Sequence, residues 1–203
     1  MKKSPILNVP NMLSFVRVLL VPAFVAAILF IKAPVWCYIL PAIVYALTAL
    51  TDMLDGKIAR KYGLVTDFGK FIDPLADKFM VLGSMLAILA WMFERGQRVQ
   101  GLIFVWVVLI ILFRELAVTS MRLVVAGKKV KVDLAANMMG KLKTVSQMVG
   151  TVLIIIEPLI FGDNHIMSYV CMGIMAFTTI ASGWNYLMGY LPYIVGTDEA
   201  DNA

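Results

Sequence analysis

Six long apolar runs follow one another along this chain of 203 residues. A transmembrane helix needs about 20 mostly apolar residues. Because 61% of the residues are apolar and only 15% are charged, too little polar surface remains to cover a water-soluble core. We therefore expect an all-α integral membrane protein and exclude a soluble enzyme, a disordered chain and a disulfide-stapled secreted domain. The six predicted transmembrane helices cover residues 12–31, 36–55, 72–93, 100–125, 145–161 and 167–189.

The apolar runs repeat almost from one end of the chain to the other. This pattern predicts a single membrane-embedded domain, residues 1–196, followed by a short polar tail, residues 197–203. The fifth run is the shortest and contains Glu157 and Pro158 near its end. Six spans place both termini on the same side of the membrane.

Basic residues are distributed unequally between the two ends of the predicted helices. Cytoplasmic loops of membrane proteins carry an excess of Lys and Arg. Only Lys32, Arg95 and Arg98 fall at one end. The other end carries Lys2, Lys3, Lys57, Arg60, Lys61, Lys70, Lys78, Lys128, Lys129, Lys131, Lys141 and Lys143. We therefore expect both termini to be cytoplasmic, and the net charge of +5 needs no nucleic-acid partner.

Aromatic residues are expected at both membrane interfaces, where their partly polar rings are stable. Trp36 and Trp91 fall at the predicted outer interface, and Trp184, Tyr186 and Tyr190 fall at the inner one. The aromatic residues and the basic residues thus indicate the same orientation.

Four carboxylates stand near the cytoplasmic ends of the second and third predicted helices: Asp52, Asp55, Asp73 and Asp77. Ionisable groups at membrane depth are costly and mark functional sites. The spacings of three and four residues place each pair on one helix face. Converging carboxylates repel one another unless they are neutralised, and oxygen ligands without His or Cys suit Mg²⁺ or Mn²⁺. A cation pair there could bridge a diphosphate during phosphoryl transfer, whereas helix capping by solvated aspartates is the alternative.

Small residues accompany these carboxylates. Gly56 and Ala59 lie within about 40° of Asp52 around a helix, and Gly69 lies on the side of Asp73. Residues of this size allow a ligand or another helix to approach closely.

The run from Asp52 to Asp77 reads DMLDGKIARKYGLVTDFGKFIDPLAD and matches the pattern D-x2-D-G-x2-A-R-x8-G-x3-D-x3-D at every fixed position. This pattern resembles the signature of the CDP-alcohol phosphotransferases, also called CDP-alcohol phosphatidyltransferases. Other segments resemble the bacterial phosphatidylglycerophosphate synthases of that family, although Ser14 stands where the common form has Thr. These segments are Asn8 to Ser14, Arg17, Pro22, Arg114 to Leu116, Arg122, Gly140 to Thr144 and Ser182-Gly183.

The resemblance implies transfer of a phosphatidyl group from CDP-diacylglycerol to an alcohol, with release of CMP. It implies that the four aspartates hold two divalent cations, Mg²⁺ or Mn²⁺, and that Asp77 is the general base. It also implies a bacterial inner-membrane enzyme, and members of the family often form homodimers through membrane helices. The residues that would bind CDP-diacylglycerol are Asp55, Gly56, Ala59, Arg60 and Gly69.

The acceptor has to be inferred from other residues. Glycerol 3-phosphate carries a dianionic phosphate, so its pocket needs Arg or Lys. Arg114 and Arg122 are two helical turns apart and share a face, and Lys141 and Lys143 begin the next helix. We expect these four residues to bind glycerol 3-phosphate. The alternatives are an internal pair between Arg114 and Glu115, and lysines that serve only as inner-loop charges.

Two other functions remain open from the sequence. A sister synthase could use the same donor to make cardiolipin, phosphatidylinositol phosphate or phosphatidylserine. A cation transporter could also place carboxylates in a membrane. A transporter would need polar groups toward the outer face, but the outer halves of the second and third helices, residues 38–48 and 81–91, are nearly uncharged.

Overall fold

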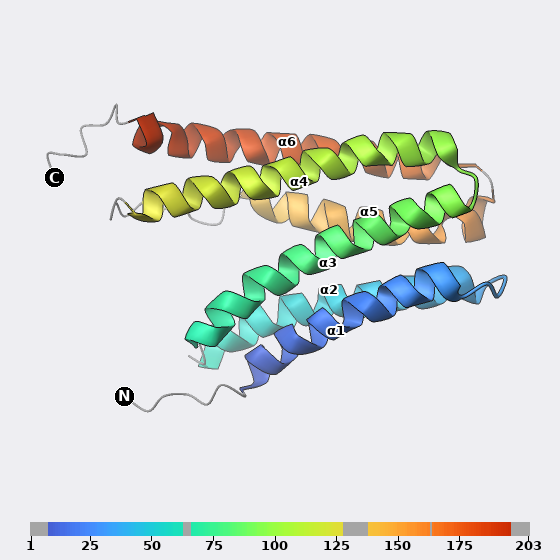
Figure 1. The fold of residues 1–203 in the computed structure, drawn as a ribbon, viewed down its shortest axis with the longest axis horizontal. Helices are drawn as coiled ribbons and strands as arrows, with labels where there is room; N and C mark the ends of the chain where they lie inside the picture. The colour runs from blue at the N-terminus through green and yellow to red at the C-terminus, as the bar shows by residue number, and fades with distance from the viewer. Residues whose placement is uncertain (1–7, 63–65, 128–137, 163, 196–203) are drawn as a thin grey trace, which may run out of the picture.

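The computed structural model describes residues 8–62, 66–127, 138–162 and 164–195, and in these segments it contains helices and no strands. Side chains at 9–10, 52–62, 67, 70, 126 and 195 lie outside that description. The prediction of an all-α protein is confirmed (Figure 1). The six helices are α1 (Val9–Phe30), α2 (Trp36–Tyr62), α3 (Asp67–Glu94), α4 (Arg98–Gly127), α5 (Met138–Phe161) and α6 (Ile166–Val195).

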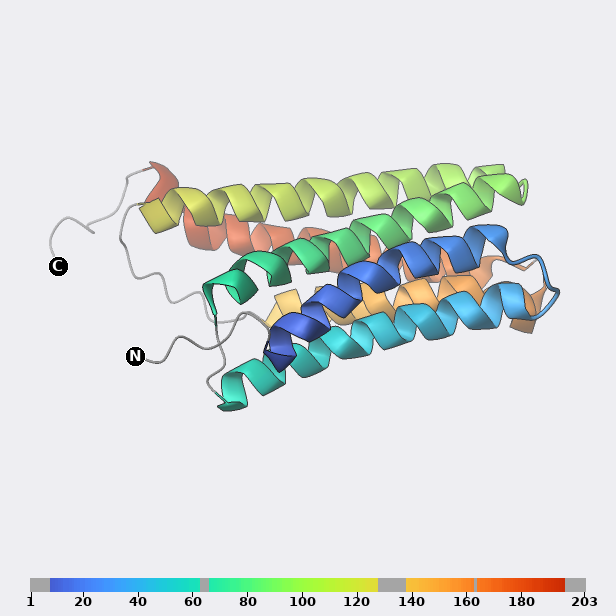
Figure 2. The same cartoon turned by 60° about the horizontal axis from the view of Figure 1, so that its bottom comes forward.

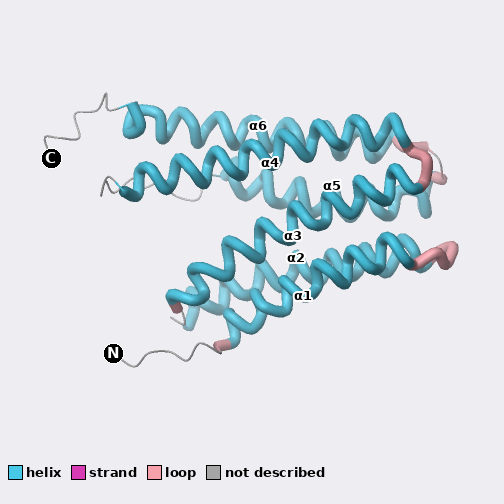
Figure 3. The backbone as a smooth tube through the Cα atoms, viewed as in Figure 1, coloured by secondary structure: helices cyan, strands magenta, loops and turns pink. Residues whose placement is uncertain are grey.

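The helices run up and down as one elongated bundle, joined at the right of Figure 3 by short loops. We call the end where α1, α3 and α5 begin the first end, and the end where they finish the second end. Helix α1 packs against α2 and α3, while α6 packs against α4 and α5. Contacts of α3 with α4 and of α2 with α5 join these two groups (Figure 2). The described chain thus starts and finishes at the first end (Figure 1).

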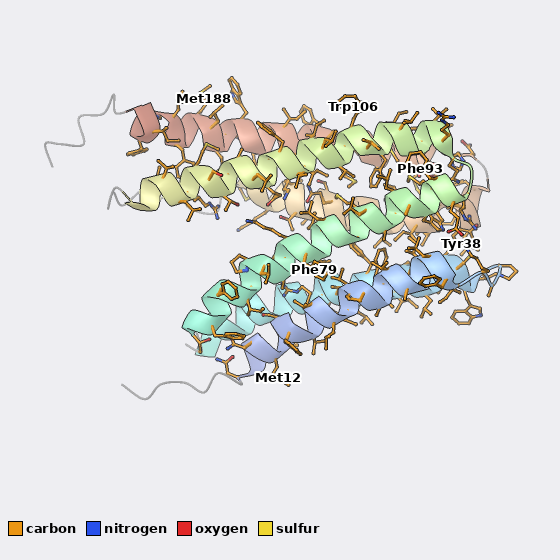
Figure 4. All side chains as sticks on the ribbon, viewed as in Figure 1. Met12, Tyr38, Phe79, Phe93, Trp106 and Met188 are labelled. Carbon is orange, nitrogen blue, oxygen red and sulfur yellow. The ribbon has the colours of Figure 1, made fainter. Side chains whose placement is uncertain are left out.

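The outer surface of the bundle is apolar along its length. Phe30, Trp106 and Phe113 are 77%, 69% and 75% exposed. Figure 4 shows Trp106 on the outer side of α4 and Met12 at the outer edge of α1. Five helices contain stretches long and apolar enough to cross a membrane, and the described part of α2 adds a shorter one, Trp36–Thr51. So large an exposed apolar surface suits lipid rather than water, as a membrane protein requires.

The fifth helix begins well before the apolar run that predicted it. That run starts at 145, whereas α5 begins at Met138. Lys143, which lies in the added turns, is buried and forms an ion pair with Glu115 of α4. Because Glu115 neutralises the Lys143 ammonium inside the bundle, α5 can include this charged residue before its apolar run begins.

The buried apolar core is concentrated toward the second end. On α3 it contains Met80, Ile88 and Trp91, which continue the face that carries Asp73 and Asp77 at the first end. On α1, Ser14 and Arg17 likewise precede buried apolar residues on one face, namely Val21, Phe24 and Ile28. Both inward faces therefore change from polar to apolar along the helix, which leaves the first half of the bundle as its polar half.

Two of the five aromatic residues expected at the membrane interfaces are exposed, and three are buried. Trp91, Tyr186 and Tyr190 are buried inside the bundle, and the rings of Tyr186 and Tyr190 stack with centroids 6.1 Å apart. Trp36 and Trp184 are exposed, as a membrane-interface position requires. Ring type alone could not separate lipid-facing aromatics from those that pack between helices.

Candidate active site

Helix α1 contacts the start of α3 at Gly69, a residue without a side chain. Thr66 caps α3: its Oγ1 accepts a hydrogen bond from the Gly69 amide at 2.9 Å. Asn11 of α1 donates from Nδ2 to the same Thr66 Oγ1 at 2.9 Å. A Cβ added to Gly69 would lie 2.7 Å from Asn11 Oδ1, closer than real Cβ contacts. Gly69 therefore serves to bring α1 and α3 together, and its predicted contact with CDP-diacylglycerol stays a prediction.

One turn further along α1, Ser14 contacts Asp73 of α3. Ser14 is fully buried, and its Oγ donates a hydrogen bond to Asp73 Oδ1 at 2.5 Å. A hydroxyl donor stabilises the charged form of a carboxylate and restricts its rotation.

Arg17 contacts Asp77 of α3. Its side chain is fully buried, and its Nη1 forms an ion pair with Asp77 Oδ1. The Asp77 side chain, in contrast, is 52% exposed. The Arg17 guanidinium thus contacts the carboxylate from inside the bundle, while about half of the Asp77 side chain stays exposed.

Asp73 and Asp77 could serve as metal ligands. Both project from one face of α3, one turn apart, and in the bonds described above Ser14 and Arg17 contact Oδ1 of Asp73 and Asp77. A carboxylate has a second oxygen, so these contacts are compatible with ligation, and oxygen donors suit Mg²⁺ or Mn²⁺. Asp52 and Asp55 lie in the last turns of α2, but their side chains, like those of Gly56, Ala59 and Arg60, fall outside the described residues.

Among the described side chains alone, no group of three acidic, His or Cys residues could hold a metal ion. The two described aspartates of α3 would need the aspartates of α2 to complete the predicted set. The four-aspartate site therefore stays a prediction.

A second polar cluster joins α4, α5 and α6. Glu115 Oε1 accepts from Arg114 Nη1 at 3.0 Å and from the Lys143 ammonium. Arg114 Nη2 also donates to Ser182 Oγ at 2.7 Å. A Cβ added to Gly183 would lie 3.2 Å from Cγ of Arg114, so this glycine gives the arginine stem its space. The internal pair of Arg114 with Glu115, the alternative from the sequence, is present, and it includes Lys143 as well.

Arg122 belongs to the same cluster through Tyr186. Its Nη2 donates to the Tyr186 hydroxyl at 3.2 Å, and its guanidinium carbon lies 5.3 Å from the ring centroid. The Arg114 guanidinium carbon lies 5.1 Å from the centroid of the same ring. Both arginines thus contact one aromatic side chain, as their shared helix face predicts. Lys141 is exposed and lies about 200° from Lys143 around α5, so its role at an acceptor pocket stays a prediction.

The aspartates and the basic cluster lie close enough to interact. Lys78, which follows Asp77 on α3, donates from Nζ to Thr119 Oγ1 of α4 at 2.9 Å. The negative charge of Asp77 also acts on the Lys143 ammonium of α5. The first half of the bundle therefore combines an acidic group on α3 with a basic group on α4 and α5.

Sequence reasoning did not assign site roles to Arg17, Ser14, Lys78 or Tyr186. Arg17 carried a usable signal, because an arginine in the middle of an apolar run marks a functional position by default. Ser14 and Tyr186 gave no comparable signal, since hydroxyl groups are common in membrane helices.

The sequence profile of the CDP-alcohol phosphatidyltransferases matches residues 7–184 of this chain. A Bacillus subtilis protein named CDP-diacylglycerol--glycerol-3-phosphate 3-phosphatidyltransferase is 34% identical, with 88% of this chain and 93% of the relative covered. Proteins of the same name are 33% identical in Rickettsia typhi, covering 92% of this chain and 98% of the relative, and 31% identical in Pseudomonas fluorescens, covering 93% and 92%. The chain belongs to the CDP-alcohol phosphatidyltransferase family.

Proposed function

We propose that this protein transfers the phosphatidyl group of CDP-diacylglycerol to sn-glycerol 3-phosphate, giving phosphatidylglycerophosphate and CMP. The observation that carries this proposal is the excess of positive charge beside Asp77. Arg114 and Lys143 share one carboxylate, Glu115, and Arg122 lies against the same tyrosine as Arg114. A neutral acceptor would not need such an excess, whereas a phosphate dianion does. The names of the similar bacterial proteins support the same acceptor.

Asp52, Asp55, Asp73 and Asp77 would hold two divalent cations, Mg²⁺ or Mn²⁺. When bound, the ions would neutralise charge on the diphosphate of the donor. Gly56, Ala59 and Arg60 follow Asp55 on α2 and, with Gly69, would complete the donor pocket. Ser14 and Arg17 would keep the α3 carboxylates in place through the contacts described above.

Asp77 is the proposed general base. Its partly exposed carboxylate would accept the proton of the acceptor hydroxyl if that hydroxyl came within about 3 Å. The acceptor oxygen would then form a bond to the β-phosphorus, and the bond from that phosphorus to the bridging oxygen would break. CMP leaves with the electron pair of the broken bond. Arg114, Arg122, Lys141 and Lys143 would hold the phosphate of the acceptor during this transfer.

We place the first end of the bundle in the cytoplasm of a bacterium, with six transmembrane helices in the inner membrane. The support is the basic-residue asymmetry, because Lys32, Arg95 and Arg98 are the basic residues at the second end. In this orientation a lipid donor and a soluble phosphate acceptor both reach the polar half of the bundle. A homodimer through membrane helices is part of the same proposal.

The deciding experiment uses full-length protein in detergent with CDP-diacylglycerol, Mg²⁺ or Mn²⁺, and one acceptor at a time. The acceptors are glycerol 3-phosphate, inositol phosphate, serine and phosphatidylglycerol. We expect CMP release and a new phospholipid only with glycerol 3-phosphate, and loss of both after chelation of the metal. A product formed only with another acceptor would identify a sister synthase. Cation flux into vesicles without CMP release would identify a transporter.

A further inference from the structure

We infer that Arg17 is a positioning residue for Asp77, and that the inward face of α1 fixes Asp73 and Asp77 in the orientation that metal and donor binding require. The inference rests on the proposed function, because it assigns these aspartates to the reaction. It adds a residue of the first helix to a site whose signature lies wholly in α2 and α3.

The two partners of the ion pair, Arg17 and Asp77, are buried to different degrees. Arg17 is fully buried, whereas about half of the Asp77 side chain is exposed. A salt bridge that served only to join two helices would not need one partner open to the outside. A buried cation that contacts Oδ1 from within instead limits rotation of the carboxylate.

Polar contacts between α1 and α3 repeat along these two parallel helices. Ser14 contacts Asp73, and three residues later Arg17 contacts Asp77, four residues after Asp73. Asp73 and Asp77 thus each meet a polar partner from α1. One chance contact could be incidental, but two in register indicate that α1 positions the pair.

Helices α1 and α3 are also held together by contacts other than the ion pair of Arg17 with Asp77. On one side, Gly69 lets Asn11 approach α3, and on the other a Cβ at Gly83 would lie 2.8 Å from Cγ1 of Val21. At the second end, Lys32, which follows α1, pairs with Glu94, the last residue of α3. The Arg17 side chain is therefore set between two close contacts of α1 with α3, and its own role is to orient Asp77.

The experiment compares Arg17→Gln and Arg17→Lys with a matched control, Lys32→Gln. Lys32→Gln removes another ion pair between the region of α1 and that of α3, at the opposite end of the bundle, where 67% of the Lys32 side chain and 49% of the Glu94 side chain are exposed. Mn²⁺ affinity and the electron paramagnetic resonance spectrum are measured on full-length protein in detergent with CDP-diacylglycerol and no acceptor. CMP release with glycerol 3-phosphate is measured separately, and thermal unfolding reports folding.

For Arg17→Gln we expect Mn²⁺ binding about 10-fold weaker with an altered spectrum, as is usual when a residue that orients a metal ligand is removed. We expect kcat to fall on the order of 100-fold, because a misplaced reacting group slows the reaction strongly, while KM for CDP-diacylglycerol changes little. Arg17→Lys keeps the charge without the planar fork and should fall between Gln and the wild type. Lys32→Gln should match the wild type in every measurement.

A folded Arg17→Gln variant with wild-type Mn²⁺ affinity and kcat would overturn the inference. If that variant does not fold, Arg17→Lys and Ser14→Ala decide, and wild-type Mn²⁺ binding by both would overturn it as well. The proposed acceptor can fail separately: the Mn²⁺ comparison contains no acceptor and keeps its meaning. A wild-type protein that binds no Mn²⁺ would remove the proposed metal site and this inference together.

Discussion

Lys143 on α5 forms an ion pair with Glu115 on α4, and only 8% and 18% of their side-chain surfaces are exposed. Arg114 binds the same oxygen of Glu115, so one carboxylate holds two cations. Two shielded cations repel each other strongly unless an anion separates them. Glu115 therefore allows Arg114 and Lys143 to lie together, and the trio still leaves one positive charge in excess.

The first prediction concerns Glu115→Gln, which leaves Arg114 and Lys143 without their shared anion. Breaking one partner out of a buried ion pair is strongly destabilising, so the free energy of unfolding should fall by about 3–5 kcal/mol. Thermal unfolding of the detergent-purified protein would measure the change.

Glu94→Gln is the matched control for this prediction. Glu94 pairs with Lys32, but 49% and 67% of their side chains are exposed. An exposed pair contributes about 0–1 kcal/mol, so this variant should unfold almost like the wild type. Equal losses in the two variants would contradict the special role of Glu115.

Relations within one helix were predictable from the sequence. The spacing of Asp73 and Asp77, and that of Arg114 and Arg122, places each pair on a common face because the helix repeat is fixed at 3.6 residues. In the structure the first pair faces α1, and the second pair lies against Tyr186. The helices themselves followed from hydropathy for the same reason, since length and apolarity are properties of one segment.

Relations between helices were not predictable in this way. The pairing of Arg17 with Asp77 depends on how far α1 and α3 slide and rotate against each other, which the packing at Gly69 and Gly83 decides. The early start of α5 has the same origin, because Lys143 is neutralised only by a residue of α4. Such information is absent from any single segment of the chain.

The second prediction concerns Gly69→Ala at the contact of α1 with α3. The added Cβ would lie 2.7 Å from Asn11 Oδ1 and 3.2 Å from Thr66 Oγ1, so the cap of α3 must shift. Overpacking of this kind costs about 1–3 kcal/mol, and we expect a lower unfolding temperature together with reduced activity.

Gly173→Ala in α6 is the comparison for Gly69→Ala. A Cβ at Gly173 meets no atom within 4 Å. Alanine in an open helical position should leave stability unchanged or raise it by about 0.5–1 kcal/mol. A Gly69→Ala variant as stable as Gly173→Ala would show that α1 and α3 tolerate the wider spacing.

The third prediction concerns Arg122→Ala, which removes one cation of the proposed acceptor pocket. Arg122 is exposed and donates to the Tyr186 hydroxyl, so the fold should survive its loss. A charge-assisted hydrogen bond to phosphate contributes about 1.5–3 kcal/mol, so KM for glycerol 3-phosphate should rise on the order of 10-fold or more. Steady-state kinetics with varied acceptor, with Arg98→Ala at the second end as control, would measure it. An unchanged KM would remove Arg122 from the pocket.

The fourth prediction concerns Asp77→Asn, which should abolish CMP release in a protein that still folds. The amide oxygen of asparagine can accept the hydrogen bond from Arg17, so the contact between α1 and α3 is kept in a weaker form. The amide cannot accept a proton from the acceptor hydroxyl, and Arg17 loses the negative charge of this partner, so activity should vanish and the unfolding temperature should fall. CMP release, circular dichroism and gel filtration would test both parts, with Glu94→Gln as a variant expected to keep wild-type activity. A folded Asp77→Asn protein with wild-type turnover would exclude Asp77 as the general base.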